Sequence, residues 1–63
     1  MINYETIRDA EKNGYVIHCY DEFGDYSHTI DLLFHDESES EDFARILNEE
    51  TEEAYKNGQI STI

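Results

Sequence analysis

The sequence has no proline, one cysteine and only four basic residues among its 63. The single cysteine, Cys19, excludes an internal disulfide and is typical of a reducing compartment. The longest apolar run is the three residues 32–34, far short of the roughly 20 that span a bilayer, and residues 1–5 lack the basic and apolar regions of a signal peptide. We therefore expect a cytoplasmic protein with no membrane partner.

Sixteen acidic residues against four basic ones give a net charge of −12. Binding DNA or RNA requires Lys and Arg to neutralise phosphates, so this charge argues against nucleic acid as a direct ligand. It favours a partner with a basic groove, because such grooves attract anions. High charge is also typical of disordered chains, but eight Tyr and Phe residues and a periodic apolar pattern favour a folded one.

The chain has room for one small domain with a thin core, so we predict a single domain over residues 1–63. Its first part predicts a helix over residues 4–13. Asn3 suits an N-cap, Glu5 lies where the helix dipole favours an acid, and Gly14 lies where a C-terminal glycine belongs.

Residues 15–20 and 26–35 are rich in β-forming side chains, and the stretch 21–25 between them predicts a turn. A three-residue loop places the two apolar sets on opposite faces, whereas a four-residue loop at 21–24 unites them on one face, which we favour. The united residues are Tyr15, Ile17, Cys19, Ile30, Leu32 and Phe34. Strict alternation adds Tyr26 and His28 to this face.

Ser38 and Glu41 form a capping box that predicts a long helix over residues 39–56, ended by Asn57-Gly58. Its apolar side is one stripe, and its other side is strongly acidic. The stripe consists of Phe43, Ala44, Leu47, Thr51 and Ala54, with Ile46 at its edge. Residues 59–63 add a short third strand or form a loose tail. The predicted fold is α+β in α-β-β-α order, an antiparallel hairpin packed against helices.

The acidic residues concentrate in the second half of the chain. Between Asp36 and Glu53 there are nine acids and one base, a net of −8, against −4 for the other 45 residues. A helix about 27 Å long places neighbouring carboxylates roughly 5–6 Å apart, close to the spacing of phosphates along a DNA strand. The alternative is a merely solvated helix face, but such faces usually mix Lys with Glu, and Glu49 and Glu53 form a like-charge pair.

Metal and catalytic sites are weaker hypotheses. The three histidines lack the spacing of a zinc site, and residues 21–25 lack the ligand order of a calcium loop. Cys19 and His18 are adjacent on a predicted strand and face opposite ways, so they form no nucleophile–base pair. We therefore expect no cofactor, no metal and no enzymatic activity.

The predicted hairpin carries a second candidate surface. Tyr20 and Tyr26 flank its turn, and Phe23 lies at the tip among the acids Asp21, Glu22 and Asp25. An exposed aromatic in an acidic loop suits an interface anchor. The alternative is that Phe23 folds back onto the core.

A small acidic chain of this layout resembles the phage anti-CRISPR proteins and, more broadly, the DNA-mimic inhibitors of host defence enzymes. The resemblance is carried by the predicted opening helix 3–14, the hairpin 15–34, the acidic loop 36–42 and the acidic helix 39–53. It implies that the protein blocks the DNA- or PAM-binding groove of a CRISPR-Cas complex, either Cascade or a Cas9-type effector, in an infected or lysogenic bacterial host. Such grooves read DNA through Lys and Arg.

The charge pattern and the aromatic residue at the hairpin tip, rather than the resemblance, select the residues that we expect to bind a partner. They are Asp36, Glu37, Glu39, Glu41, Asp42, Glu49, Glu52, Glu53, Asp21, Glu22, Phe23 and Asp25. The rival hypothesis is a protein-interaction module, antitoxin-like or a host-takeover regulator, that binds through the hairpin aromatics. The sequence leaves both a monomer and a homodimer open.

Overall fold

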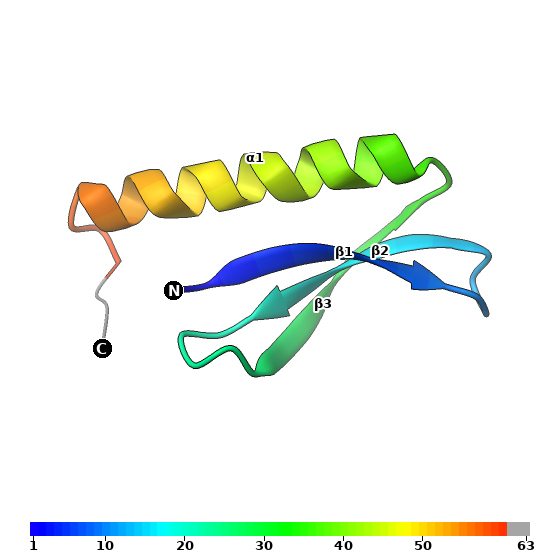
Figure 1. The fold of residues 1–63 in the computed structure, drawn as a ribbon, viewed down its shortest axis with the longest axis horizontal. Coiled ribbons are helices and arrows are strands. Elements are labelled where there is room, and N and C mark those ends of the chain that lie inside the picture. Colours follow the sequence, from blue (N-terminus) through cyan, green and yellow to red (C-terminus); the bar gives the residue numbers. More distant parts are fainter. Residues whose placement is uncertain (61–63) are drawn as a thin grey trace.

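The computed structural model describes residues 1–60, in which three strands form one antiparallel sheet and one helix covers a face of it (Figure 1). The elements are β1 (Asn3–Asp9), β2 (Gly14–Tyr20), β3 (Tyr26–Phe34) and α1 (Glu37–Lys56). The predicted α+β class is therefore confirmed, but the element order is β-β-β-α. Within the described residues, no helix combines the length and the apolar character needed to cross a membrane.

The predicted helix over residues 4–13 is wrong, because residues 3–9 form the edge strand β1. Its side chains alternate, and Thr6 pairs with the fully buried Ile17 of β2. The cap-like residues Asn3 and Glu5 serve no helix. Pairing with β2 gives the backbone of this segment regular hydrogen-bond partners. A helix of about ten residues is only marginally stable by itself, so the strand is favoured.

The turn between β1 and β2 shows why Gly14 is not the C-terminal glycine of a helix. Asn13 has the left-handed backbone (φ 54°) that was expected of Gly14, and Asn tolerates it. Gly14 begins β2 instead. A Cβ there would lie 2.6 Å from the carbonyl oxygen of Phe34 and 2.8 Å from Cδ1 of Leu33, so glycine is needed for close packing against β3.

The β2–β3 hairpin unites one apolar set as predicted, but with a different register. Ile17 pairs with Ile30 and Tyr15 with Phe34, so these four share a face. The loop has five residues, because Tyr20 pairs with Tyr26. Register shifts beside Tyr20 and between Tyr15 and Ile17 break the strict alternation, so the assignment of Tyr26 to the helix-covered face is wrong.

Helix α1 begins two residues earlier than predicted. Its N-cap is Asp36, whose side chain accepts a hydrogen bond from the backbone N–H of Ser38 at 2.9 Å, so Ser38 is helical and forms no capping box. The other end is as predicted, with Lys56 in the last turn and Gly58 at φ 73°. Beyond it, residues 59 and 60 form no strand, and 61–63 lie outside the described residues, where the rest of the predicted third strand falls.

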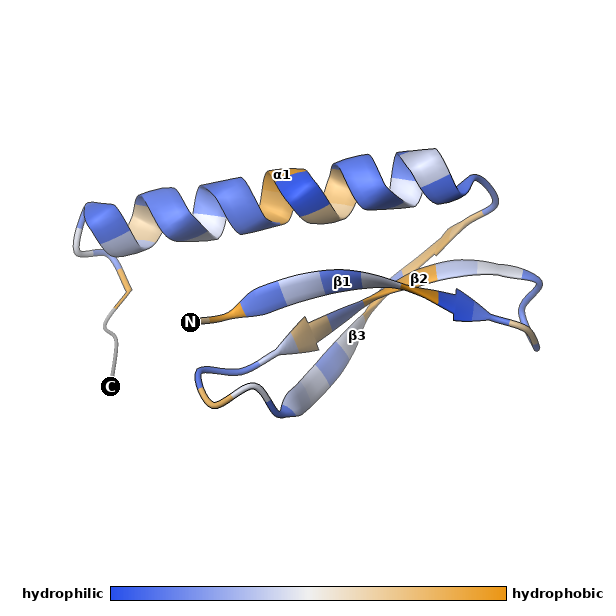
Figure 2. Cartoon of the chain, in the orientation of Figure 1, coloured by the Kyte–Doolittle hydropathy of each residue, from blue (hydrophilic) through white to orange (hydrophobic). Residues whose placement is uncertain are grey.

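The core between α1 and the sheet is thin. Ile17, Cys19 and Ala44 are buried there, and the rings of Phe34 and Phe43 meet at a centroid distance of 5.4 Å. Val16 is also buried, on the other face of the sheet. Figure 2 shows the apolar colours on β2, on the end of β3 and at a few positions of a largely hydrophilic α1. The predicted apolar stripe of α1 is buried or half-buried throughout, and Ile46 at its edge is exposed.

Candidate interaction surface

All predicted binding residues on α1 and at its N-cap are exposed. A 20-residue helix is about 30 Å long, and α1 runs along the long dimension of a molecule measuring 38 × 20 × 14 Å (Figure 1). Asp42, Glu49 and Glu53 project away from the sheet, opposite the buried Ser40 and Ala44. The helix therefore presents a row of carboxylates to solvent.

This row is less purely acidic than the sequence count suggests. The Arg45 guanidinium lies 3.1 Å from a carboxylate oxygen of Glu49 and 3.7 Å from one of Asp42, and the Lys56 ammonium lies 3.4 Å from Glu52. Counted to its observed end, the segment 36–56 carries nine acids and two bases, a net of −7. The expectation that this face avoids mixed i,i+4 charge pairs is thus wrong in two places.

Five carboxylates of α1 form no ion pair with any residue of the described part of the chain. They are Glu37, Glu39, Glu41, Glu50 and Glu53. Three of them lie in the first two turns, next to the N-cap carboxylate of Asp36. The carboxylates without an ion-pair partner are therefore most concentrated at the N-terminal end of α1, and they are not spread evenly along the helix.

The predicted loop residues lie at the opposite end of the molecule, beside the C-terminal end of α1 (Figure 1). Asp21 builds this loop, since one of its carboxylate oxygens accepts hydrogen bonds from the backbone N–H groups of Phe23 and Asp25 at 2.9 and 3.0 Å. The structure therefore separates the loop 21–25 from the acidic stretch 36–42, and one partner contacts both only if its binding site extends along the whole helix.

Glu22 faces inward and fastens the loop to the rest of the fold. Its carboxylate accepts a hydrogen bond from the hydroxyl of Tyr55 and lies 3.3 Å from the amino group of Met1. The hydrogen bond to Glu22 raises the pKa of the Tyr55 hydroxyl above its usual value. Because its charge is engaged inside the molecule, Glu22 is a structural residue, and its assignment as a partner contact loses its basis.

The aromatic residues of the hairpin end are accessible. Phe23 leaves 73% of its surface exposed, so it does not fold back onto the core, and Tyr26 is 56% exposed. The Tyr26 ring meets His18 edge-on at 5.1 Å, and Tyr20 lies 6.3–6.4 Å from both. The inclusion of His18 depends on the strand register, which the sequence alone had not established.

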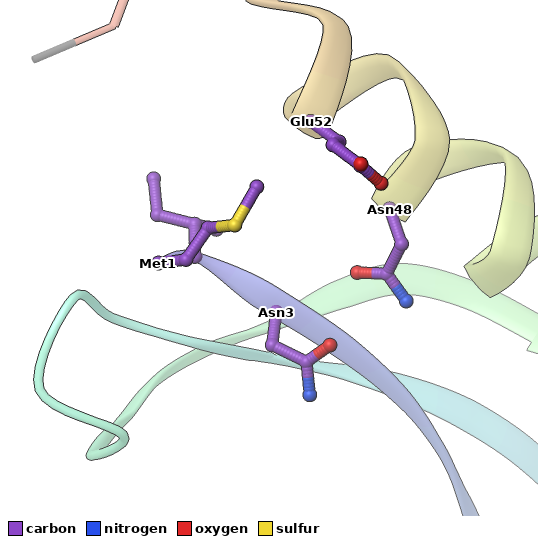
Figure 3. A pocket seen from close by; sticks show the side chains of 5 residues that line it. Met1, Asn3, Asn48 and Glu52 are labelled. Atoms are coloured by element: carbon purple, nitrogen blue, oxygen red, sulfur yellow. The ribbon is translucent and has the colours of Figure 1, made fainter. Parts of the chain in front are cut away.

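A shallow pocket of about 230 Å³ lies where the start of β1 meets α1, lined by Met1, Ile2, Asn3, Asn48 and Glu52 (Figure 3). Asn48 is the structural link here. Its side-chain oxygen accepts from the backbone N–H of Tyr4 at 2.8 Å, and its amide donates to the carbonyl of the same residue at 2.9 Å. Sequence reasoning missed this contact, although a lone Asn among the apolar positions of the helix was a signal.

Tyr4, which Asn48 contacts, is half-buried against the buried Cys19. Burial raises the pKa of the Tyr4 hydroxyl, and the nearby thiol of the buried Cys19 raises it further. Ser40, fully buried, shares a 2.9 Å hydrogen bond with Thr6. No group of three or more His, Cys, Asp or Glu side chains in residues 1–60 is placed to hold a metal ion.

No protein-family model matches the chain, and neither a curated protein nor a solved structure is significantly similar to it.

Proposed function

We propose that this protein is a non-enzymatic inhibitor that uses the carboxylates of α1 to occupy a basic, nucleic-acid-binding groove of another protein. In its specific form, the groove is the DNA- or PAM-binding site of a Cascade or Cas9-type complex. This form depends on the resemblance of the hairpin, the acidic loop and the acidic helix to anti-CRISPR proteins, since the opening helix of that layout is strand β1 here. The observation that carries the proposal is the set of five exposed, unpaired carboxylates on one 20-residue helix.

The shape of α1 supports a mimic of a DNA strand. The helix is straight in Figure 1 and lies on the outside of the molecule along its full length. Its exposed side is therefore a narrow rod that a groove built for a duplex backbone can accept. Carboxylates on neighbouring turns lie about 5–6 Å apart, which suits Lys and Arg side chains that otherwise bind successive phosphates.

Electrostatics supports the same partner class. Crowding of like charges on a small domain opposes its own folding, and a cationic groove relieves that repulsion on binding. Such association is fast at low ionic strength and falls steeply as salt is added, because exposed charges are screened beyond about 10 Å at 0.1 M salt. The expected complex is salt-sensitive and competes with DNA.

The test uses two matched variants that each change the net charge by +4. E39K/E50K reverses two unpaired α1 carboxylates, and E11K/D31K reverses two exposed acids outside α1. Neither removes an ion pair or a hydrogen bond of the structure. Immobilised wild type is exposed to a bacterial lysate in low and high salt, bound proteins are identified, and duplex DNA is added as competitor.

The proposal expects wild type and E11K/D31K to retain nucleic-acid-binding proteins at low salt and to release them to duplex DNA, while E39K/E50K retains few. A target-cleavage assay with Cascade and with a Cas9-type effector tests the specific form. Equal loss by both variants indicates that only total charge matters, and retention of no nucleic-acid-binding protein by wild type rejects the proposal.

A further inference from the structure

A second surface lies at the hairpin end, on the face of the sheet that α1 leaves uncovered. We call it the aromatic hairpin end and define it as His18, Tyr20, Phe23 and Tyr26. Register places His18, Tyr20 and Tyr26 together, since Tyr20 pairs with Tyr26 and the three rings lie 5.1–6.4 Å apart at tilted or edge-on angles. Phe23 stands in the loop that joins the two tyrosines.

His18 and Tyr20 are half-buried, and hydrogen bonds constrain the positions of the two exposed residues, Phe23 and Tyr26. The hydroxyl of Tyr26 shares a 2.7 Å hydrogen bond with Thr29. The loop that carries Phe23 is closed by backbone bonds between Asp21 and both Gly24 and Asp25, in addition to the side-chain bonds of Asp21. An aromatic surface that loses little conformational entropy on binding is an efficient interface anchor.

Carboxylates outnumber cations around this surface, where the amino group of Met1 is engaged with Glu22 at 3.3 Å. The loop 21–25 contains three acids and no base, and Glu5 pairs with His18 on the adjacent strand. The four Lys and Arg residues are all elsewhere. Arg45 and Lys56 are in ion pairs on α1, Lys12 is in the β1–β2 turn at the other end of the sheet, and Arg8 stacks on Tyr15.

The Arg8 contact shows the chemistry that such a surface accepts. Its guanidinium carbon lies 5.4 Å from the centroid of the Tyr15 ring, within the range of a cation–π interaction. The aromatic hairpin end offers similar ring faces beside carboxylates, and no Lys or Arg side chain in residues 1–60 stacks on them. Guanidinium suits it better than ammonium, because the planar group stacks on rings and is less strongly hydrated.

We propose that the aromatic hairpin end is a docking surface for an arginine-bearing segment of a partner protein, with guanidinium groups stacked on Tyr20, Phe23 and Tyr26 and neutralised by Glu5 and Asp25. The inference does not depend on the role of α1 as a DNA mimic, because the surface lies on the other face of the sheet and at the end away from the acidic stretch 36–42.

The experiment uses three short peptides as probes, identical except that they carry arginine, lysine or neutral citrulline at alternate positions. Binding to ¹³C,¹⁵N-labelled protein is followed by NMR, residue by residue. The variant F23L/Y26L removes two aromatic faces, keeps comparable apolar bulk and alters exposed positions. E39K/E50K is the matched control for the acidic helix.

We expect the arginine peptide to shift the ring signals of the aromatic hairpin end and to bind more tightly than the lysine peptide. F23L/Y26L is expected to weaken the arginine peptide about three- to tenfold, the size of one or two exposed cation–π contacts, and to weaken the lysine peptide less. E39K/E50K is expected to weaken both cationic peptides, because it reverses acidic charge, and to leave the ring shifts unchanged. An effect of E39K/E50K on partner binding therefore tests the proposal for α1, whereas the ring shifts test the aromatic hairpin end.

Three outcomes overturn the inference. The first is equal affinity for the arginine and lysine peptides in wild type and in F23L/Y26L. The second is a set of shifts confined to α1. The third is a wild-type dimer in sedimentation that F23L/Y26L converts to a monomer, since a second copy of the chain then covers the surface.

Discussion

Replacing Asn48 tests the contact that fastens α1 to the free edge of β1. Asn48 satisfies both backbone groups of Tyr4 on the side that faces away from β2, at 2.8 and 2.9 Å. Each bond is worth about 1 kcal/mol net, and Asn48→Ala regains roughly 0.5 kcal/mol of helix propensity. We therefore expect a loss of about 1.5 kcal/mol, a large share of the roughly 3–9 kcal/mol typical of a chain this size.

Asn48→Asp separates the hydrogen bond that Asn48 accepts from the one that it donates. The carboxylate still accepts from the N–H of Tyr4 but faces the carbonyl of the same residue, where the amide had donated. At pH 7 we expect a loss larger than that of Asn48→Ala, about 2–3 kcal/mol. The site favours the protonated acid, which donates again, so the folded-state pKa exceeds the unfolded value of about 3.9. The stability is present below that value and is lost as pH rises.

Urea and thermal denaturation followed by circular dichroism at pH 7 and pH 3.5, always relative to wild type, measure both effects. The expected fall in Tm for Asn48→Ala is about 6–12 °C. Asn3→Ala is the matched control, because Asn3 is exposed and makes no side-chain hydrogen bond within the described residues. If both Asn48 variants stay within about 0.5 kcal/mol of wild type, α1 is not fastened to β1 in this way.

Three further predictions concern stability. Gly14→Ala is expected to cost about 1–3 kcal/mol by denaturation, because its Cβ would lie 2.6 Å from the Phe34 carbonyl oxygen; an unchanged midpoint would show that β3 yields easily. Adding 0.5 M NaCl is expected to raise the Tm of the free protein by screening its repulsion while it weakens partner binding, so parallel effects of salt on both would contradict the electrostatic account. The pKa of Tyr4 is raised by burial and that of Tyr55 by its hydrogen bond to Glu22, so stability is full below about pH 10 and falls as pH rises further; tyrosinate absorbance should show two late-ionising groups that Tyr4→Phe and Tyr55→Phe each reduce by one.

The ion pairs of α1 narrow the candidate surface. Arg45 partly neutralises Asp42 and Glu49, and Lys56 partly neutralises Glu52. The middle and the C-terminal end of α1 therefore have the mixed charges of an ordinary solvated helix face. A groove-binding surface is therefore expected to centre on the unpaired acids near the N-terminal end. Variants at Glu39 and Glu41 are expected to affect partner binding more than variants at Glu49 and Glu52.

Helix α1 shows what local signals can predict. Its apolar stripe, its acidic outer side and its end at Lys56 followed by Gly58 were read from spacing and cap residues. The start was placed two residues late, because Asp36 and Ser38 are both good caps and only the geometry shows that Asp36 bonds the N–H of Ser38. Exposure of the acidic residues followed from the same periodicity.

Strand β1 shows where local signals mislead. Residues 3–14 contain a cap-like Asn, an early Glu and a terminal Gly, and these fit a helix as well as a strand. The segment is a strand because β2 offers a full set of pairing partners and because Asn48 and Tyr55 bond its outer edge near Tyr4 and Ile2. Asn48 and Tyr55 are distant in sequence, whereas β2 follows β1 after a turn of four residues, so the hairpin lay within one short window and the helix-like cap residues masked it.

By itself, the sequence determined the charge, the β-formers of the hairpin and the amphipathic helix, since composition and periodicity act over a few neighbouring residues. Tertiary structure decided which acids remain unpaired, that Glu22 turns inward to Tyr55, and that register shifts bring His18, Tyr20 and Tyr26 onto one uncovered face. The ion pairs of α1 are local, but they depend on side-chain geometry that spacing does not give. The bond between Glu22 and Tyr55 joins segments far apart in the chain, and a shift of one residue in strand register changes the face on which a side chain lies.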